Sequence, residues 1–275
     1  MSYKTIEYEC HDHIGLLTLN RPDRLNALSL EMAQELRRFF LTLEEHLDAR
    51  VLIMRGAGRA FCAGFDVAGL SGGMAKIDGT SNMPTGAAAY GHMVQRAMNA
   101  LIMNMRQAPQ PIIAAVRGPA VGGGFSLTMA CDVRLAGESA RFNAANIRIG
   151  YTGADMGSSY FLPRLIGLSR AAEYMYTGRT MDAATAERIG FVSRMVPDDQ
   201  LDQAATRLAQ EMLQATPLAL RLTKELLNAN VDAPSLAVAG QLEAGCQLLC
   251  GMTEDAGEAI KAAYFEKRPP VYHDR

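Results

Sequence analysis

One stretch, Ile112–Ser126, restricts what this chain can fold into more than any other. It begins with a continuous apolar run, Ile112–Val116, which is typical of a strand buried on both faces. The chain then turns at Gly118-Pro119 and reaches three consecutive glycines, Gly122–Gly124, after which residues 125–130 can form a short helix. A strand that leads through side-chain-free backbone into a helix leaves free N–H groups facing a cavity.

Such N–H groups can bind a phosphate, or the oxygen of a carbonyl that is becoming an oxyanion. The stretch contains neither the Gly-Lys-Ser/Thr of a P-loop nor a Gly-x-Gly-x-x-Gly fingerprint, which argues against a nucleotide phosphate. The alternative, close helix–strand packing through glycine, stays open at this point.

Composition bounds the class of protein. A chain of 275 residues, 49% of them hydrophobic, can bury a large core, either as one domain or as a domain with a helical appendage. A net charge of −2 gives no electrostatic case for nucleic acid or for an anionic membrane. No apolar run is long enough for a membrane span, and the polar N-terminus is unlike a signal peptide. These features predict a cytoplasmic protein.

The five cysteines and five histidines are scattered along the chain. Cys246 and Cys250 lie one helical turn apart, but no cysteine or histidine nearby completes a zinc site. We therefore expect reduced, mostly buried thiols and no bound metal.

The N-terminal part predicts a hairpin over residues 3–19 and then a loop over 20–28, which is rich in Pro, Asp and Asn. Ser29 is expected to cap a helix over residues 30–47, ahead of a buried strand at 51–55.

A second run of small residues, Gly58–Val67, follows this strand and again allows backbone N–H groups to face a cavity. Residues 71–86 predict a mobile loop and residues 87–106 a helix. The order strand, turn, strand, helix therefore occurs twice, which indicates a repeated β-β-α unit.

Beyond the central stretch, residues 132–136 predict a strand, 142–150 an extended segment and 151–157 a turn into a helix. The pattern after residue 168 is helical, apart from a strand-like run at 191–196. Asp198, Thr216 and Thr253 are candidate helix caps.

The chain resembles the crotonase superfamily, the enoyl-CoA hydratase/isomerase family, through an ordered set of short motifs that covers nearly its whole length. The motifs are Asn20-Arg21-Pro22, Leu25-Asn26-Ala27-Leu28, Ala60–Asp66, Gly118–Gly124, Met129–Asp132, Thr177-Gly178-Arg179, Gly190-Phe191-Val192, Val196-Pro197 and Tyr264–Arg268. The resemblance implies an α/β fold, a crotonase-like spiral of β-β-α units. We expect this core, with the acyl-CoA site, over residues 1–197, and a helical C-terminal region that drives trimer formation over 198–275.

The resemblance also implies an acyl-CoA thioester as substrate, no separate cofactor, a place in fatty-acid metabolism, and trimers that often pair into hexamers. The thioester oxygen would accept hydrogen bonds from the backbone N–H groups of Phe65 and Gly123. Each such preorganised donor can lower the reaction barrier by about 2.7–4 kcal/mol.

Further residues are implied to hold the coenzyme A part, largely through main-chain contacts: Arg24, Leu25, Ala27, Ala63, Asp66 and Val67. Tyr264 and Lys267 resemble family residues that reach the CoA nucleotide, often across a subunit boundary. The alternative for Tyr264 is a core contact and for Lys267 a solvated charge.

The departures from the family pattern concern catalysis. Hydratases of the family use two glutamates to activate water, and Ser126 and Asn146 stand at those positions here. Neither side chain is a carboxylic acid or base. Asp155 matches the base of dienoyl-CoA isomerases when it is counted back from Leu162-Pro163, and the alternative is a helix N-cap. A base at this place would need partial desolvation to raise its pKa.

Other roles stay open for three residues. Ser126 could bind water or a substrate oxygen, whereas a nucleophilic serine would need a base that no histidine evidently supplies. Asn146 could hydrogen-bond substrate or water, or be buried among backbone partners. Cys62 is expected to be a small buried packing residue.

We therefore expect proton transfer or double-bond isomerisation on an enoyl-CoA, with Asp155 as the base. One alternative is hydration or dehydration with water held by Ser126 and Asn146, and another is a non-catalytic protein that binds acyl-CoA. The loop over residues 71–86 and the methionines at 83, 93 and 98 are expected to shape the acyl pocket.

Overall fold

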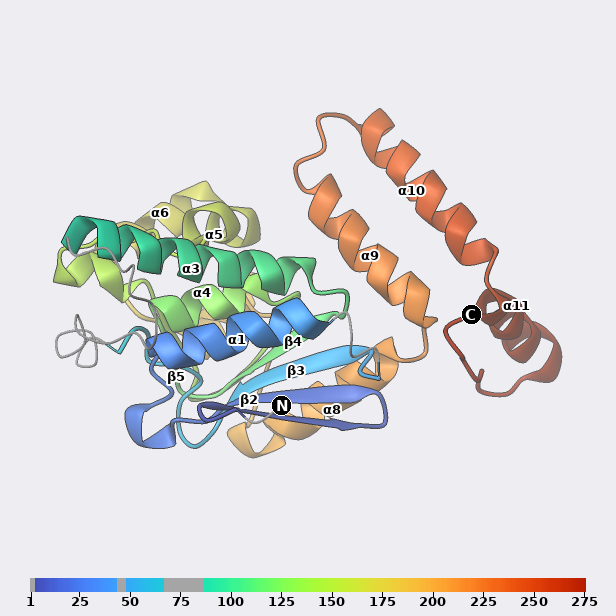
Figure 1. Ribbon diagram of the computed structural model, residues 1–275, viewed down its shortest axis with the longest axis horizontal. Helices are drawn as coiled ribbons and strands as arrows, with labels where there is room; N and C mark the ends of the chain where they lie inside the picture. Colours follow the sequence, from blue (N-terminus) through green and yellow to red (C-terminus); the bar gives the residue numbers. More distant parts are fainter. Residues whose placement is uncertain (1–2, 44–47, 67–86) are drawn as a thin grey trace.

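The computed structural model describes residues 3–43, 48–66 and 87–275. A six-stranded sheet with the strand order β1-β2-β3-β4-β6-β9 lies at its centre (Figure 1). Its strands are β1 (Ile6–His11), β2 (Ile14–Leu19), β3 (Val51–Gly56), β4 (Ile112–Val116), β6 (Val133–Gly137) and β9 (Arg194–Val196). The predicted hairpin is confirmed, since β1 and β2 pair antiparallel, and each later pair of neighbours is parallel.

A smaller sheet has the order β5-β7-β8 and consists of β5 (Pro119–Val121), β7 (Arg141–Asn143) and β8 (Met181–Asp182). The chain passes from β4 in the large sheet to β5 in the small sheet before the helix α4 (Gly123–Ala130). It passes in the same way from β6 to β7. This repeated step is the predicted β-β-α spiral, which is thereby confirmed.

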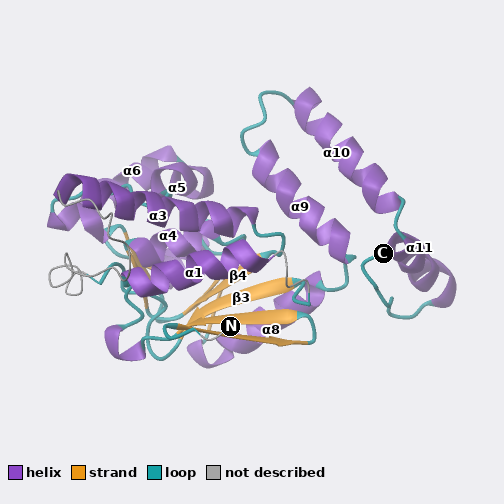
Figure 2. Cartoon of the chain, viewed as in Figure 1, coloured by secondary structure: helices purple, strands orange, loops and turns teal. Residues whose placement is uncertain are grey.

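Helices cover both faces of the large sheet, as Figure 2 shows. Leu52 and Met54 of β3 point into the larger cluster of buried side chains, beneath α1, α3 and α4, whereas Val51 and Ile53 point toward α8. Burial of both faces explains the continuous apolar runs in the sequence. The remaining core helices are α1 (Leu30–Thr42), α3 (Ala87–Gln107), α5 (Ser158–Ile166), α6 (Leu168–Thr177), α7 (Ala183–Arg188) and α8 (Leu201–Met212), with 3₁₀ turns η1 (Pro22–Arg24), η3 (Ala145–Ile149) and η4 (Asp198–Gln200).

Helix α8, which follows the predicted boundary at 197/198 after the turn η4, packs on the sheet. The helices that follow project from the core as an arm (Figure 1): α9 (Pro217–Asn230), α10 (Leu236–Gly251), α11 (Glu254–Ile260) and the π-helical turn η5 (Lys261–Glu266). The arm is held at Lys224 of α9, which is 4% exposed. Its Nζ lies 3.1 Å from the Asp132 carboxylate and donates to the Gln110 carbonyl at 2.8 Å.

Three of the predicted helix caps are confirmed: the side chains of Ser29, Thr216 and Thr253 accept hydrogen bonds from amides three residues later. The cap predicted at Asp198 is wrong. Its carboxylate instead accepts a hydrogen bond from the Ser139 amide at 3.1 Å, and the residue that precedes η4 is Pro197.

The prediction of an extended segment over residues 142–150 is wrong after Asn143. The Asn143 carbonyl accepts a hydrogen bond from the Gly122 amide at 2.8 Å, and the chain then winds into η3. The turn closes at Gly150, whose φ of +86° suits glycine. This turn brings Asn146 to the glycine stretch.

All five cysteines are free thiols, of which Cys62 and Cys131 are buried and the other three are partly exposed. The expectation that most of them are buried is therefore wrong. In the described ranges, no helix is long and apolar enough to cross a membrane.

Candidate active site

The two glycine-rich stretches meet at the start of α4. The Cys62 amide donates to the Pro119 carbonyl at 3.0 Å, and the Val121 amide donates to the Cys62 carbonyl at 2.9 Å. Gly124 packs so closely that a Cβ there would lie under 3.0 Å from the Cys62 carbonyl oxygen. Backbone therefore contacts backbone, which confirms the close packing expected of the glycines, and Gly123 begins the helix.

A third loop fixes the segment that contains Phe65. It winds around the fully buried Asn26, whose Nδ2 donates to the carbonyls of Ala57 and Ala60 at 2.9 and 2.8 Å. Leu28 then pairs with this segment, since its amide donates to the Gly64 carbonyl at 2.8 Å and its carbonyl accepts from the Asp66 amide at 3.0 Å. In such a parallel bridge the N–H of Phe65 points away from Leu28.

Phe65 and Gly123 are neighbours in space. A Cβ built on Gly123 would lie 3.5 Å from Cε2 of Phe65 and 2.9 Å from Cδ1 of Leu28. Gly123 is the first residue of α4, where an N–H has no partner within the helix. Within the described ranges, neither the Phe65 amide nor the Gly123 amide donates to a protein acceptor.

The carboxyl group of Asp155 lies beside this pair of loops. Asn146 lies between Asp155 and the glycine stretch. Its Nδ2 donates to Asp155 Oδ2 at 3.3 Å, and its Oδ1 lies 2.9 Å from where a Cβ of Gly122 would be. Burial raises the pKa of the Asp155 carboxyl, and hydrogen bonds from the Met156 amide and the Asn146 side chain oppose this shift. This partial desolvation is what a carboxylate base at this position needs in order to have a raised pKa.

The alternative role of Asp155 as a helix N-cap is wrong. Helix α5 begins at Ser158, and its N-cap is Gly157, a residue without a side chain to accept hydrogen bonds.

Ser126 is 2% exposed, and its Oγ donates to the Asp155 carbonyl at 2.9 Å. The same Oγ also lies 3.4 Å from the Gly122 carbonyl oxygen, so the contact with the Asp155 backbone is the shorter of its two hydrogen bonds. The packing role predicted for Cys62 agrees with its complete burial, which raises the pKa of its thiol to about 12.

Two further residues of this site, Ser158 and Met156, are not predicted from the sequence. Ser158 accepts a hydrogen bond from the Asp155 amide at 2.9 Å, and the spacing of three residues was the available signal. Met156 is buried with a φ of +48°, and its Sδ lies 3.3 Å from the Cβ position of Gly123. A left-handed methionine leaves no signal in a sequence, since this conformation depends on its surroundings.

The structure gathers most of the predicted CoA residues around the same loops: Arg24, Leu25, Ala27, Ala63 and Asp66. Arg24 is exposed, and Leu25, Ala27 and Ala63 are half-buried. The Asp66 carboxylate pairs with Arg21 at 2.8 Å, and the Asp66 amide is the one that donates to the Leu28 carbonyl. Val67 lies outside the described residues, as do residues 71–86 with Met83, whereas Met93 is half-buried and Met98 is buried in the core.

Tyr264 and Lys267 do not join the other predicted residues within one chain. Both belong to the C-terminal end of the arm, next to α11 and across the molecule from β5 (Figure 1). Tyr264 is 73% exposed, so the alternative of a core contact is wrong. Lys267 is exposed, in line with a solvated charge.

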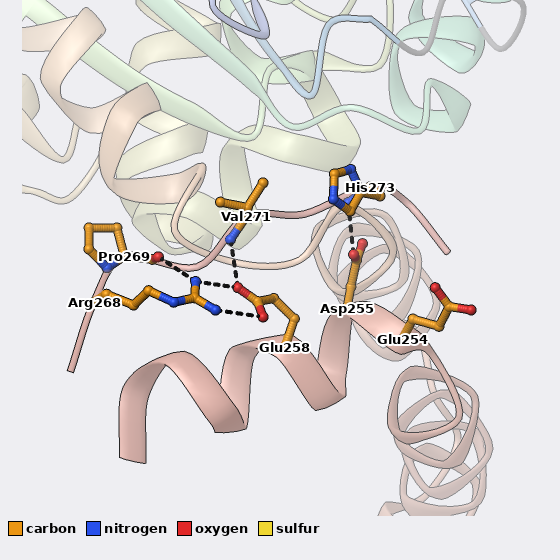
Figure 3. A pocket seen from close by; sticks show the side chains of 7 residues that line it. All are labelled: Glu254, Asp255, Glu258, Arg268, Pro269, Val271 and His273. Carbon is orange, nitrogen blue, oxygen red and sulfur yellow. Dashed lines mark hydrogen bonds and ion pairs between the residues drawn. The ribbon is translucent and has the colours of Figure 1, made fainter. Parts of the chain in front are cut away.

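A pocket of about 540 Å³ lies between α11 and the C-terminal tail (Figure 3), far from α4 and α5 (Figure 1). The Arg268 guanidinium in this pocket pairs with Glu258. The Asp255 carboxylate accepts hydrogen bonds from the amides of His273 and Asp274 at 2.8 Å. Three carboxylates and one guanidinium line the pocket, so its net negative charge is unsuited to the phosphates of CoA.

The burial of Asp155 predicts a pH-dependent change in stability. The pKa of this carboxyl is raised in the folded state. At a pH where the carboxyl is charged in both the folded and the unfolded protein, its charge therefore lowers the free energy of unfolding, and this loss disappears below the pKa of the unfolded state, about 3.9. Asp155→Asn is therefore expected to raise the free energy of unfolding near pH 7, with a gain that shrinks as the pH falls toward about 4. Urea unfolding at a series of pH values measures this.

Asp232→Asn is the matched control, because Tyr160 and Arg164 lower the pKa of Asp232. It should be destabilising near pH 7, with a loss that shrinks below about pH 3.9. An Asp155→Asn gain that is absent, or that grows on acidification, would contradict the burial of this carboxyl.

Comparisons with known proteins agree with this fold. The family model described as enoyl-CoA hydratase/isomerase matches residues 9–275. A probable enoyl-CoA hydratase EchA12 of Mycobacterium tuberculosis is 40% identical over 261 residues, which cover 95% of this chain and 90% of that protein.

Among solved structures, a putative enoyl-CoA hydratase from Streptomyces coelicolor A3(2) superposes with a TM-score of 0.90 at 37% identity, over 100% of this chain and 96% of that chain. A structure described as a monofunctional enoyl CoA isomerase from M. smegmatis gives a TM-score of 0.71 at 37% identity, over 86% of this chain and 98% of that chain. The molecule is thus a crotonase-fold enzyme that acts on CoA thioesters. It belongs to the enoyl-CoA hydratase/isomerase family.

Proposed function

We propose that this enzyme moves a double bond in an enoyl-CoA through an enolate of the thioester, with Asp155 as the proton-transfer base. One observation carries the proposal. The start of α4 brings the Gly123 amide, which has no protein acceptor in the described ranges, next to Phe65, and Ser126 of the same helix donates a hydrogen bond to the backbone of Asp155, whose carboxyl is partly desolvated. The amides of Phe65 and Gly123 would both donate to the thioester oxygen.

The proposed reaction needs no added oxidant or water. The Asp155 carboxylate takes a proton from the carbon next to the thioester carbonyl, and the electron pair left behind delocalises onto the thioester oxygen. The two N–H groups stabilise this charge because they are oriented before it forms. The protonated Asp155 then returns the proton to the γ-carbon, the double bond moves by one position, and the carboxylate is regenerated.

Hydration is the second candidate, and the hydratase names of the relatives favour it. Water would then be held by Ser126 and Asn146, although the Ser126 hydroxyl already donates to the Asp155 carbonyl. A panel of enoyl-CoA and dienoyl-CoA thioesters in deuterium- and oxygen-18-labelled water separates the candidates. Isomerisation incorporates no oxygen-18, and it incorporates deuterium only to the extent that the protonated Asp155 exchanges with the solvent before it returns the proton. Hydration incorporates both labels, and binding without turnover would identify the non-catalytic alternative.

The coenzyme A part is proposed to lie along Arg24, Leu25, Ala27, Ala63, Asp66 and Val67. Tyr264 and Lys267 would come from a neighbouring subunit, because they lie across the molecule from these loops in their own chain. The proposal includes a cytoplasmic homotrimer or hexamer without nucleic-acid or membrane partners.

The apolar surface of α10 supports this assembly. No residue of the helix is buried, and Leu248 and Leu249 are 67% and 54% exposed. Burying such a side chain stabilises an interface by about 1.5–3 kcal/mol. An exposed patch of this kind on a folded protein marks an interaction site.

Replacing both Leu248 and Leu249 with glutamine is expected to shift the protein toward a monomer of 29.7 kDa. Light scattering coupled to size-exclusion chromatography measures the mass. The control is Leu41→Gln, a similarly exposed leucine on α1, which should leave the assembly intact. A monomeric wild type, or a double variant that assembles normally, would contradict the proposed role of α10.

A further inference from the structure

The residue after Asp155 has a backbone conformation that few side chains adopt. Met156 has a φ of +48° and Gly157 a φ of +81°, so two successive residues are left-handed. This conformation costs about 1–2 kcal/mol at a residue that is not glycine. It persists only where the surrounding structure holds it, and such places concentrate at functional sites.

Two buried serines hold this turn. Ser126 Oγ donates to the Asp155 carbonyl at 2.9 Å, and the Asp155 amide donates to Ser158 Oγ at 2.9 Å. The Ser158 amide completes the set by donating to the same carbonyl at 3.0 Å. Ser126 and Ser158 are 2% and 3% exposed, so bulk water does not compete for these bonds.

Ser126 also belongs to the helix that begins with Gly123. All eight residues of α4 are buried, and the Ser126 amide donates to the Gly122 carbonyl at 3.0 Å in the first turn. One short helix therefore presents the Gly123 amide at its start and, less than one turn later, the hydroxyl that binds the backbone of Asp155. A helix packed on all sides has little freedom to move either group alone.

We propose that Ser126 is a positioning residue whose hydroxyl fixes the Asp155 carboxyl relative to the Gly123 amide, with Ser158 as the second support. This inference rests on the proposed function. Ser126 acts through the Asp155 backbone and does not contact the substrate. The position at which family hydratases are expected to carry a glutamate thus supports a base that lies elsewhere in the chain.

Ser126→Ala tests the inference. It is expected to lower kcat by about 10²-fold, the cost of a small misplacement of a catalytic group, while KM and acyl-CoA binding stay unchanged. The acid limb of the kcat profile should move to lower pH, because a looser turn admits water to the carboxyl. The substrate is the panel thioester that the wild type converts fastest. Ser126→Thr keeps the hydroxyl and should recover part of kcat.

The controls separate positioning from folding. Ser159→Ala, at an exposed neighbour, should behave as the wild type. A folded Ser126→Ala protein with wild-type kcat and an unmoved acid limb would overturn the inference. If that variant does not fold, Ser158→Ala decides in the same way, since its hydroxyl bonds the other side of Asp155.

Asp155→Asn separates a failure of the positioning role of Ser126 from a failure of the proposed function. If it is inactive while Ser126→Ala matches the wild type, the positioning role fails and the proposed function stands. If Asp155→Asn keeps full turnover, the proposed function fails and the positioning role fails with it.

Discussion

Asp155→Asn is expected to reduce turnover by about 10²–10⁴-fold, the usual contribution of a positioned acid or base. The amide of asparagine has nearly the same shape and can still accept the hydrogen bond from Asn146. It cannot take up a proton at neutral pH, so the enolate does not form. Affinity for acyl-CoA should stay within a few-fold of the wild type, because the proposed CoA contacts lie on other loops.

Steady-state kinetics and calorimetric titration with a saturated acyl-CoA measure the two quantities separately. The matched control is Asp132→Asn, in which another half-buried carboxylate pairs with Arg106 and Lys224 outside the site. It should lower stability while the surviving folded protein keeps its turnover. Full activity of Asp155→Asn would remove Asp155 from the mechanism.

Gly124→Ala is expected to have the largest effect on the framework of the site. A Cβ there would lie under 3.0 Å from the Cys62 carbonyl oxygen and 2.8 Å from Cys62 Cβ. The loop around Cys62 and helix α4 would have to separate, at a cost of about 3 kcal/mol in stability. Because Phe65 and Gly123 lie on these two elements, turnover of the remaining folded protein should fall by about 10²-fold.

Thermal or urea unfolding and kinetics at a temperature well below the transition check both effects. Gly91→Ala is the control, since a Cβ on this α3 residue would meet none of the described residues within 4 Å. It should stabilise the protein by about 0.5–1 kcal/mol and leave turnover unchanged. A Gly124→Ala variant with wild-type stability and turnover would contradict the close packing of the two loops.

Local patterns in the sequence correctly predicted those elements that depend on contacts between residues close in the sequence. The apolar run at Ile112–Val116 is a buried strand, and the glycines after it begin a buried helix. Ser29 caps its helix because the donor it needs, the Met32 amide, lies three residues away. The family motifs predicted the repeated β-β-α architecture, which the two sheets confirm.

Contacts between distant segments decided the rest. Asp198 is a residue type that often caps helices, but its carboxylate accepts a hydrogen bond from the amide of Ser139, which is distant in the sequence. The turn at Asn146 follows the hydrogen bond between the Gly122 amide and the Asn143 carbonyl, and in the sequence only its end is marked, by Gly150. The partnership of Ser126 with the Asp155 carbonyl joins two elements across a sequence separation that periodicity does not encode.

A crystal structure of the protein with a saturated acyl-CoA, which has the thioester but no double bond to react, tests the central claim most directly. The account predicts that the thioester oxygen lies about 2.7–3.1 Å from both the Phe65 and the Gly123 amide nitrogens, with the Asp155 carboxyl facing the acyl chain. A thioester oxygen that contacts only one of these amides, or that binds at another part of the molecule, would contradict it.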